Sequence, residues 1–276
     1  MNSSMKRKIS FASIGDLCID VYLQKKKFFV GGTAFNAAVH AKRAGAKPSI
    51  FSAVGTDDYG ELFLTALQKH KIDSSSISVL DGETSSLSVT TAKDGHRTFS
   101  EWRLGVLEKY RLLPTDHKKL QEYRIARMTL FKPLTKLFDS FAQLQLPDTV
   151  KVADFAGSSQ YSEGTSLVEK YSKNFDIFVK SVDDQSDVSY FRQLSITYKN
   201  NLYIVLRGNK GSIAFSQGNA YEQSAIQTKV TDTNGAGDSY VANFLVTYLE
   251  TKDIARAMLA GSKAATQTIR DYGAVV

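Results

Sequence analysis

The sequence contains one cysteine, four prolines and no long hydrophobic run. A single cysteine, Cys18, excludes an internal disulfide bond and is typical of proteins in a reducing compartment. The apolar runs fall far short of the roughly 18 residues that a membrane-spanning helix needs, so we expect no membrane contact. The basic residues 1–11 lack the apolar stretch of a secretory signal. These absences predict a cytoplasmic protein.

The formal charge of +7 is the one bulk property that could indicate nucleic-acid binding. Tight basic clusters occur only at residues 6–8 and 25–27. Neither cluster is interleaved with the aromatic residues of a base-stacking surface. We therefore predict no nucleic-acid partner, and the charge suits either attraction of small anions or solubility alone.

With 276 residues, 42% of them apolar, the chain can bury a substantial core. No tract rich in serine and proline indicates a long linker. The composition therefore predicts a single domain over residues 1–276.

Short apolar runs alternate with helical patterns along most of the chain. The runs are β-branched or aromatic and bounded by Gly, Asp or Asn, which predicts strands at Ile9–Ile14, Ser49–Val54, Lys151–Phe155, Asp176–Val179 and Leu202–Leu206. Apolar residues at helical spacing predict helices at 33–44, 59–70, 240–248 and 254–269. This alternation predicts an α/β fold of three layers, with a central, mostly parallel sheet covered by helices on both faces.

Two stretches, residues 18–30 and 84–102, instead alternate polar and apolar side chains. Strands with one polar face suit a small sheet that has an exposed side. We expect such a sheet to form a lid from parts of residues 16–32 and 84–106.

The segment DTNGAGD, residues 232–238, stands directly before an apolar-periodic helix. Gly235 and Gly237 carry no Cβ, so the backbone can turn tightly and a ligand can approach closely. Their amides, with that of Ala236, would lie at a helix N-terminus, where unpaired N–H groups and the helix dipole attract anions. Asp238 would lie in the first turn, where it could accept a proton. A glycine turn with a capping aspartate is the simpler alternative.

Competing phosphate-binding motifs are absent. The chain has no Gly-Lys dipeptide, which excludes the P-loop pattern GxxxxGK[ST]. Tyr240 stands where a dinucleotide-binding fingerprint requires Gly or Ala. The HRD and DFG motifs of protein kinases are also missing.

DTNGAGD resembles the C-terminal motif DTxGAGD of the PfkB/ribokinase family of carbohydrate kinases, and the resemblance covers nearly the whole chain. GTDDYG at 55–60 resembles the GxDxxG element of that family, and Gly273-Ala274 resembles its closing GA. The resemblance implies a ribokinase-like fold with a β-sheet lid. It also implies an ATP-dependent sugar kinase in which Asp238 is the catalytic base and Gly235, Ala236 and Gly237 form an anion hole.

The resemblance also implies a sugar site. Gly31, Gly32 and Asn36 resemble the GGxxxN sugar motif, and Asp20 is placed like the aspartate that binds sugar hydroxyls. Asp16 is four residues earlier, so on one extended strand it would point to the same side, although a solvent-exposed pair is the alternative. Arg97, in the expected lid, would contact substrate or phosphate.

For the nucleotide, RGNKGS at 207–212 resembles the ATP-binding strand and turn of the family, which implies roles for Arg207, Gly208 and Gly211. Ser262 stands where many members place an asparagine near adenine.

The resemblance implies two metal ions as well. Mg2+ would accompany ATP near Asp184, which follows Ser181 in a departure from the family motif NxxE. A monovalent K+ ion would lie near Asp232 and Thr233.

GDLCIDVY at 15–22, VGTDDYG at 54–60 and RTF at 97–99 resemble bacterial fructoselysine 6-kinases most. The expected substrate is therefore a small sugar or fructosamine, and a homodimer through the lid is a further expectation. Two alternatives stay open. One is a related kinase for fructose, ribose, 2-keto-3-deoxygluconate or a nucleoside, and the other is a non-catalytic sensor with the same fold.

Overall fold

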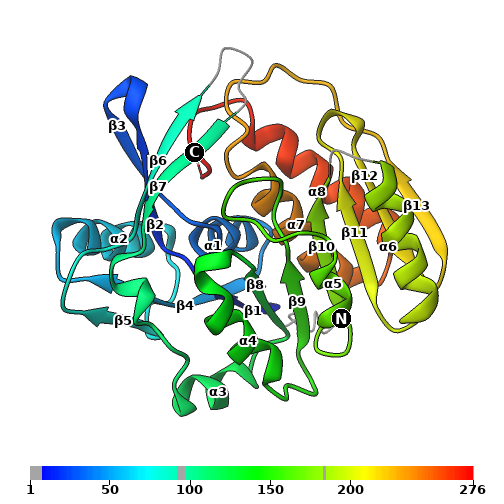
Figure 1. Ribbon diagram of the computed structural model, residues 1–276, viewed down its shortest axis with the longest axis horizontal. Helices are drawn as coiled ribbons and strands as arrows, with labels where there is room; N and C mark the ends of the chain where they lie inside the picture. The colour runs from blue at the N-terminus through cyan, green and yellow to red at the C-terminus, as the bar shows by residue number, and fades with distance from the viewer. Residues whose placement is uncertain (1–7, 92–96, 183–184, 276) are drawn as a thin grey trace, which may run out of the picture.

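The structure is a computed structural model that describes residues 8–91, 97–182 and 185–275. Within these ranges, nine strands form one large sheet in the order β13-β12-β11-β10-β9-β8-β1-β4-β5 (Figure 1). The strands are β1 (Ser10–Ile14), β4 (Lys47–Gly55), β5 (Ile77–Leu80), β8 (Ile125–Thr129), β9 (Val150–Asp154), β10 (Ile177–Ser181), β11 (Leu202–Leu206), β12 (Ser212–Ser216) and β13 (Asn219–Gln223). Neighbours from β11 to β5 pair in parallel, and β12 and β13 pair antiparallel.

Helices cover both faces of this sheet, as the alternating pattern predicts. They are α1 (Thr33–Arg43), α2 (Asp58–His70), α3 (Pro114–Leu120), α4 (Thr135–Gln143), α5 (Leu167–Lys170), α6 (Gln185–Thr197), α7 (Ala236–Thr251) and α8 (Ile254–Thr268). Short 3₁₀ turns are η1 (Leu23–Lys25), η2 (Gly105–Glu108), η3 (Lys132–Leu134) and η4 (Gly208–Lys210).

Because successive strand residues point to opposite faces, the two faces of β11 pack in different apolar clusters. In β11, Ile204 packs in one apolar cluster with residues of α1, α7 and α8, such as Phe244. Its neighbours Tyr203 and Val205 pack in the other cluster with residues of α4 and α6, such as Phe191. The three-layer α/β prediction is therefore confirmed.

Four strands form a separate small sheet in the order β3-β2-β6-β7 among the described residues. They are β2 (Cys18–Tyr22), β3 (Lys27–Gly31), β6 (Ser86–Thr91) and β7 (Arg97–Arg103). Figure 1 shows this sheet standing beside α1 and α2, away from the large sheet. Its strands fall in the ranges that the alternating pattern predicts, and Phe28 on β3 is 52% exposed. The single-domain prediction is not tested by this arrangement.

The prediction that Asp16 and Asp20 share one extended strand is wrong. β1 ends at Ile14, and Gly15 adopts a φ of +124°, a backbone conformation that favours glycine. The chain therefore leaves the large sheet before Asp16, and Asp20 lies within β2 of the small sheet. The two aspartates are held by different parts of the fold.

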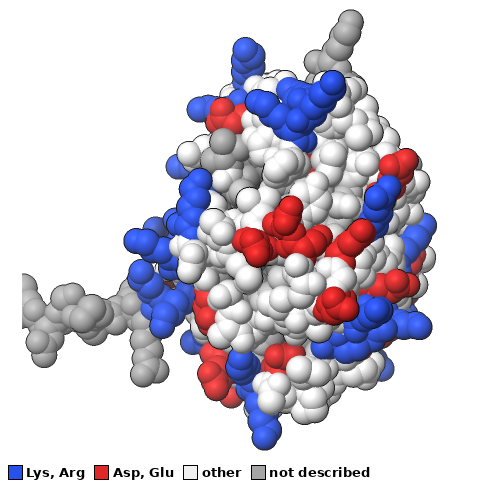
Figure 2. Space-filling model, turned by 90° about the vertical axis from the view of Figure 1, so that its left-hand side faces the viewer, with Lys and Arg blue, Asp and Glu red and all other residues white. Residues whose placement is uncertain are grey.

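Charged side chains of both signs lie on the side of the molecule that carries α2 and β3. Figure 2 shows acidic side chains near the middle of that face with lysine and arginine around them. In the part of the chain that the structure describes, every helix is too short or too polar to cross a bilayer.

Candidate active site

A cavity of about 820 Å³ lies between the small sheet and the ends of several strands of the large sheet and of helices beside it. Most residues that the sequence predicts for the site line it: Asp16, Asp20, Gly32, Asn36, Gly208, Gly211, Thr233, Gly235, Ala236, Gly237, Asp238 and Ser262. Three predicted residues, Gly31, Arg207 and Asp232, lie off its wall. Asp184 and the side chain of Arg97 fall outside the described residues.

Asp238 lies in the first turn of α7 and is 9% exposed, facing the cavity. Its Oδ2 accepts a hydrogen bond of 3.0 Å from Nδ2 of Asn36, which α1 positions. Its Oδ1 lies 3.8 Å from the guanidinium of Arg127. The side chain of Asp238 makes no capping hydrogen bond to the start of α7, so the simple capping alternative does not describe this residue.

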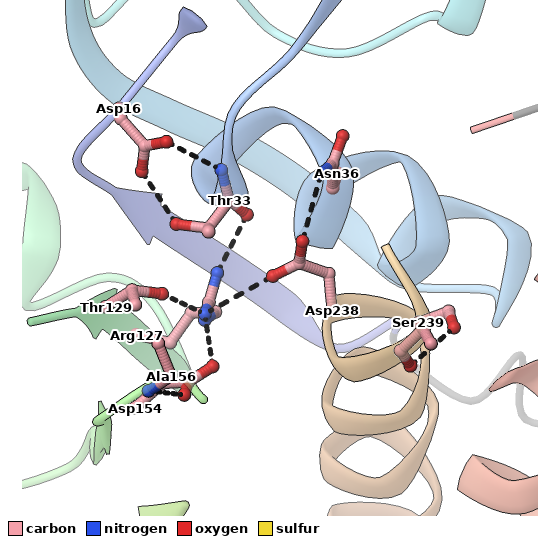
Figure 3. A network of polar contacts seen from close by, with 10 residues as sticks. Asp16, Thr33, Asn36, Arg127, Thr129, Asp154, Ala156, Asp238 and Ser239 are labelled. Carbon is pink, nitrogen blue, oxygen red and sulfur yellow. Dashed lines mark hydrogen bonds and ion pairs between the residues drawn. The ribbon is translucent and has the colours of Figure 1, made fainter. Parts of the chain in front are cut away.

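Arg127 is the residue of this site that sequence reasoning missed. It lies in β8, is fully buried, and forms a 2.8 Å ion pair with Asp154 at the end of β9. Its guanidinium also donates to the Thr129 hydroxyl at 2.6 Å and to the Thr33 carbonyl at 2.8 Å (Figure 3). One guanidinium thus links β8, β9, the start of α1 and the start of α7. The sequence feature that could have indicated Arg127 is its place inside an apolar run. An arginine in such a run is rarely buried without a partner.

Burial, one hydrogen bond and three charged side chains set the pKa of Asp238. Burial raises the pKa of Asp238 to about 7, the positive charge of Arg127 and the Asn36 hydrogen bond lower it, and Asp154 and Asp16 raise it. A carboxyl group with a pKa near neutral pH can both accept and release a proton under working conditions. Arg127 is the only described cation among these influences on the Asp238 carboxyl.

The loop before α7 turns as the glycines predict. Gly235 adopts a φ of +73°, and a Cβ there would lie 2.6 Å from the Ala274 Cβ, so this position requires glycine. Gly237 is different, since a Cβ there would meet only Leu206 at 4.0 Å. The protein itself therefore leaves open space beside Gly237 on the cavity wall. The amide of Ala236 already donates to the Thr233 carbonyl at 3.3 Å.

Asp232 lies at the centre of a second buried network. Its carboxylate accepts hydrogen bonds from the Tyr22 hydroxyl at 2.7 Å and from the amides of Asn234 at 2.9 Å and Gly273 at 3.1 Å. Nδ2 of Asn234 donates to the Asp20 carboxylate at 2.7 Å. Asn234 therefore links strand β2 to the loop before α7. Three hydrogen-bond donors thus contact the carboxylate of Asp232, whereas a cation is bound by oxygen atoms that act as electron-pair donors.

The two predicted sugar-site aspartates have different partners. Asp16 accepts hydrogen bonds from the Thr33 amide at 2.9 Å and hydroxyl at 2.7 Å, at the start of α1. Burial raises the pKa of Asp16, and these two hydrogen bonds oppose that rise. Asp20 occupies the space where a Cβ on Gly31 would stand, because such a Cβ would lie 2.6 Å from its Oδ2. Gly31 thus makes room for Asp20 and does not face the cavity itself.

Gly208 and Gly211 form the turn between β11 and β12, and both line the cavity. Gly211 has a φ of +89° and no room for a Cβ against the backbone of residues 223–225. The guanidinium of Arg207 instead lies 3.5 Å from Glu222. Ser262 in α8 also lines the cavity.

The fold agrees with a comparison against known families. The chain belongs to the pfkB family of carbohydrate kinases, whose model matches residues 9–276. It is an ATP-dependent sugar kinase.

The chain is similar over nearly its whole length to curated kinases and to solved structures. The chain is 30% identical over 266 residues to the fructoselysine 6-kinase of Shigella flexneri, covering 96% of this chain and 99% of that protein. It is 27% identical to the fructosamine kinase FrlD of Bacillus subtilis (strain 168), covering 95% and 91%. The nucleoside kinase of Methanocaldococcus jannaschii, an archaeal member of the ribokinase family, has the same fold, with a TM-score of 0.78, 20% identity and coverage of 97% and 93%. The ribokinase-like fold is therefore confirmed.

Proposed function

We propose that this sugar kinase phosphorylates a fructosamine, such as fructoselysine, at the primary hydroxyl of its sugar. The observation that carries the kinase chemistry is the buried Asp238 carboxylate, which faces the cavity at the N-terminus of α7. The substrate class is supported by the two similar kinases that act on fructoselysine or fructosamines.

In this mechanism Asp238 accepts the proton of the sugar hydroxyl while the γ-phosphoryl group transfers in line. The N-terminus of α7 and the amides of residues 235–237 stabilise the negative charge of the transferring group. The open space beside Gly237 supports close approach of that group. Arg127 keeps part of the Asp238 population ionised near neutral pH, because its charge opposes the effect of burial.

The sugar hydroxyls bind Asp16, Asp20 and Asn36, and Gly31 and Gly32 shape the backbone beside them. Oδ1 of Asn36 supports this assignment because it is buried without a hydrogen-bond partner within the described residues. A buried acceptor of this kind is costly unless a ligand donates to it. Arg97 would add a contact from β7.

ATP binds beside η4 and α8, where Gly208, Gly211 and Ser262 line the cavity. Arg207 borders this turn and Asp184 would lie near the phosphates. Mg2+, when bound with ATP, would neutralise phosphate charge. Among the described residues, no cluster of three or more His, Cys, Asp or Glu side chains could hold a metal.

Complete chelation of divalent metal should therefore reduce turnover to background, because the phosphate charge would no longer be neutralised. The measurement is ATP turnover with excess chelator, followed by restoration with magnesium. Full activity in chelator would contradict the proposed phosphate site.

K+ near Asp232 and Thr233 stays a prediction, although the donors around the Asp232 carboxylate argue against that side chain as a ligand. The measurement is ATP turnover with tetramethylammonium in place of potassium. The rate should change if K+ binds there, and an unchanged rate would contradict this prediction.

Two further proposals concern the environment of the protein. A homodimer through the small sheet would cover the exposed Phe28 on β3. A cytoplasmic location and the lack of a nucleic-acid partner are predictions of the composition, and neither enters the mechanism.

An assay across a substrate panel tests the proposed function directly. We expect kcat/KM for fructoselysine to exceed the values for fructose, ribose, 2-keto-3-deoxygluconate and nucleosides by at least about 10-fold, the size of one good discriminating contact. Faster phosphorylation of a nucleoside or of ribose would favour a related kinase. The absence of ATP turnover with every sugar and fructosamine would favour the sensor, which the intact Asp238 argues against.

A further inference from the structure

Five aromatic residues line the same cavity, and three of them pack together: Trp102 on β7, Phe131 just after β8, and Tyr161 in the segment after β9. The Trp102 ring lies 5.3 Å from each of the other two rings, at 87° to Phe131 and 81° to Tyr161. All three are half-buried. These edge-to-face pairs pack the three rings against one another into one aromatic wall. Ring surface of this wall that faces the cavity can bind an alkylated ammonium group.

Hydrogen bonds hold this aromatic wall in shape. The Trp102 amide donates to the Tyr161 hydroxyl at 2.9 Å, and Nε2 of Gln160 donates to the Phe99 carbonyl at 3.1 Å. Both contacts join the small sheet to the segment after β9. The wall is therefore formed before any ligand arrives, which lowers the entropy that binding would cost.

The aromatic wall adjoins the sugar end of the cavity. Nε1 of Trp102 donates to the Ser85 hydroxyl at 2.9 Å, and that hydroxyl lies 3.4 Å from the Cys18 sulfur. Cys18 stands between Asp16 and Asp20 in the chain, and both aspartates line the cavity. A cation against the aromatic wall would thus have two carboxyl groups nearby.

We propose, resting on the proposed function, that Trp102, Phe131 and Tyr161 bind the amine-bearing arm of the fructosamine and so select it over a plain ketose. In a fructosamine the nitrogen is attached at C1, and a 6-kinase acts on the hydroxyl at C6, at the other end of the sugar chain. With C6 at Asp238 and the hydroxyls at the aspartates, C1 leads toward the aromatic wall. A secondary amine is a cation near neutral pH, and its alkyl groups pack on the rings.

Two substitutions of Trp102 separate this role from simple packing. Trp102→Leu and Trp102→Phe both remove the hydrogen bond to Ser85, so only the aromatic ring distinguishes them. We expect Trp102→Leu to raise KM for fructoselysine by about 3- to 30-fold, the range of a cation–π contact, and Trp102→Phe to retain most of the affinity. For both variants kcat and KM for ATP should stay within about 2-fold of wild type, because the ring does not touch the reacting groups.

Fructose and Asp20→Ala serve as controls. Fructose lacks the amine, so its binding or turnover should change little in Trp102→Leu, whereas Asp20→Ala should weaken both sugars alike. Equal losses for fructose and fructoselysine in Trp102→Leu, or equal effects of leucine and phenylalanine, would overturn the aromatic subsite. A wild-type enzyme that prefers another sugar would instead overturn the proposed function, so the two failures are distinguishable.

Discussion

Replacing Asp238 by asparagine should lower kcat by about 10²–10⁴-fold, the usual contribution of a general base. The amide keeps the size of the side chain but cannot take the proton of the sugar hydroxyl. ATP affinity should stay the same or rise slightly, because a negative charge near the phosphates disappears. Single-turnover rates and ATP binding of the two proteins measure both effects.

A matched control is available in α8. Asp253 caps that helix by accepting a hydrogen bond of 3.0 Å from the Arg256 amide, and it does not line the cavity. Asp253→Asn should leave kcat unchanged and cost at most about 1 kcal/mol of stability, since asparagine also caps helices. If Asp238→Asn behaved like Asp253→Asn, the proposed base would be wrong.

The main sheet could be predicted because its central strands are buried on both faces. Such strands read as continuous apolar runs, and the five predicted ones all occur as β1, β4, β9, β10 and β11. β8 was not predicted because Arg127 interrupts its apolar run. That arginine is tolerated in the core only through its partners on other elements, and sequence periodicity carries no information about them.

The site was predictable where one short motif contains it. DTNGAGD places the anion-binding turn and the carboxylate of Asp238 within seven residues, and the structure puts both on the cavity wall. The contacts that organise the site were not predictable, because they join distant residues. Tyr22 and Asp232 are 210 positions apart in the chain, and Asn36 and Asp238 are 202 apart. Pairings of this kind follow from the fold and not from spacing.

Arg127 gives the other large expected effect. Arg127→Met should reduce the free energy of unfolding by about 3–5 kcal/mol, because it leaves buried carboxylates without their cation. Asp154 would lose a 2.8 Å ion pair and Asp238 its only described cationic neighbour. Adding Asp154→Asn to this variant should recover part of the loss, since the unpaired charge is then removed.

An exposed ion pair supplies the comparison for this stability effect. Lys170 lies 3.4 Å from Asp139, and both side chains are about half exposed. Lys170→Met should cost no more than about 1 kcal/mol, because solvent screens such pairs. Denaturant unfolding measures all of these variants. A cost for Arg127→Met as small as that for Lys170→Met would show that the buried guanidinium does not stabilise this site.

Substitutions of Arg127 and of Asp154 should shift the pH dependence of activity in opposite directions. Asp238 must be ionised to act as a base and its pKa is about 7, so kcat/KM should fall as the pH is lowered through about 7. The charge of Arg127 lowers this pKa and that of Asp154 raises it. Arg127→Met should therefore shift the acid limb of the pH profile to higher pH, and Asp154→Asn should shift it to lower pH. If the ion pair between Arg127 and Asp154 had only a structural role, both variants would lose activity but keep the same pH profile. Two unshifted acid limbs would therefore contradict electrostatic control of the Asp238 pKa.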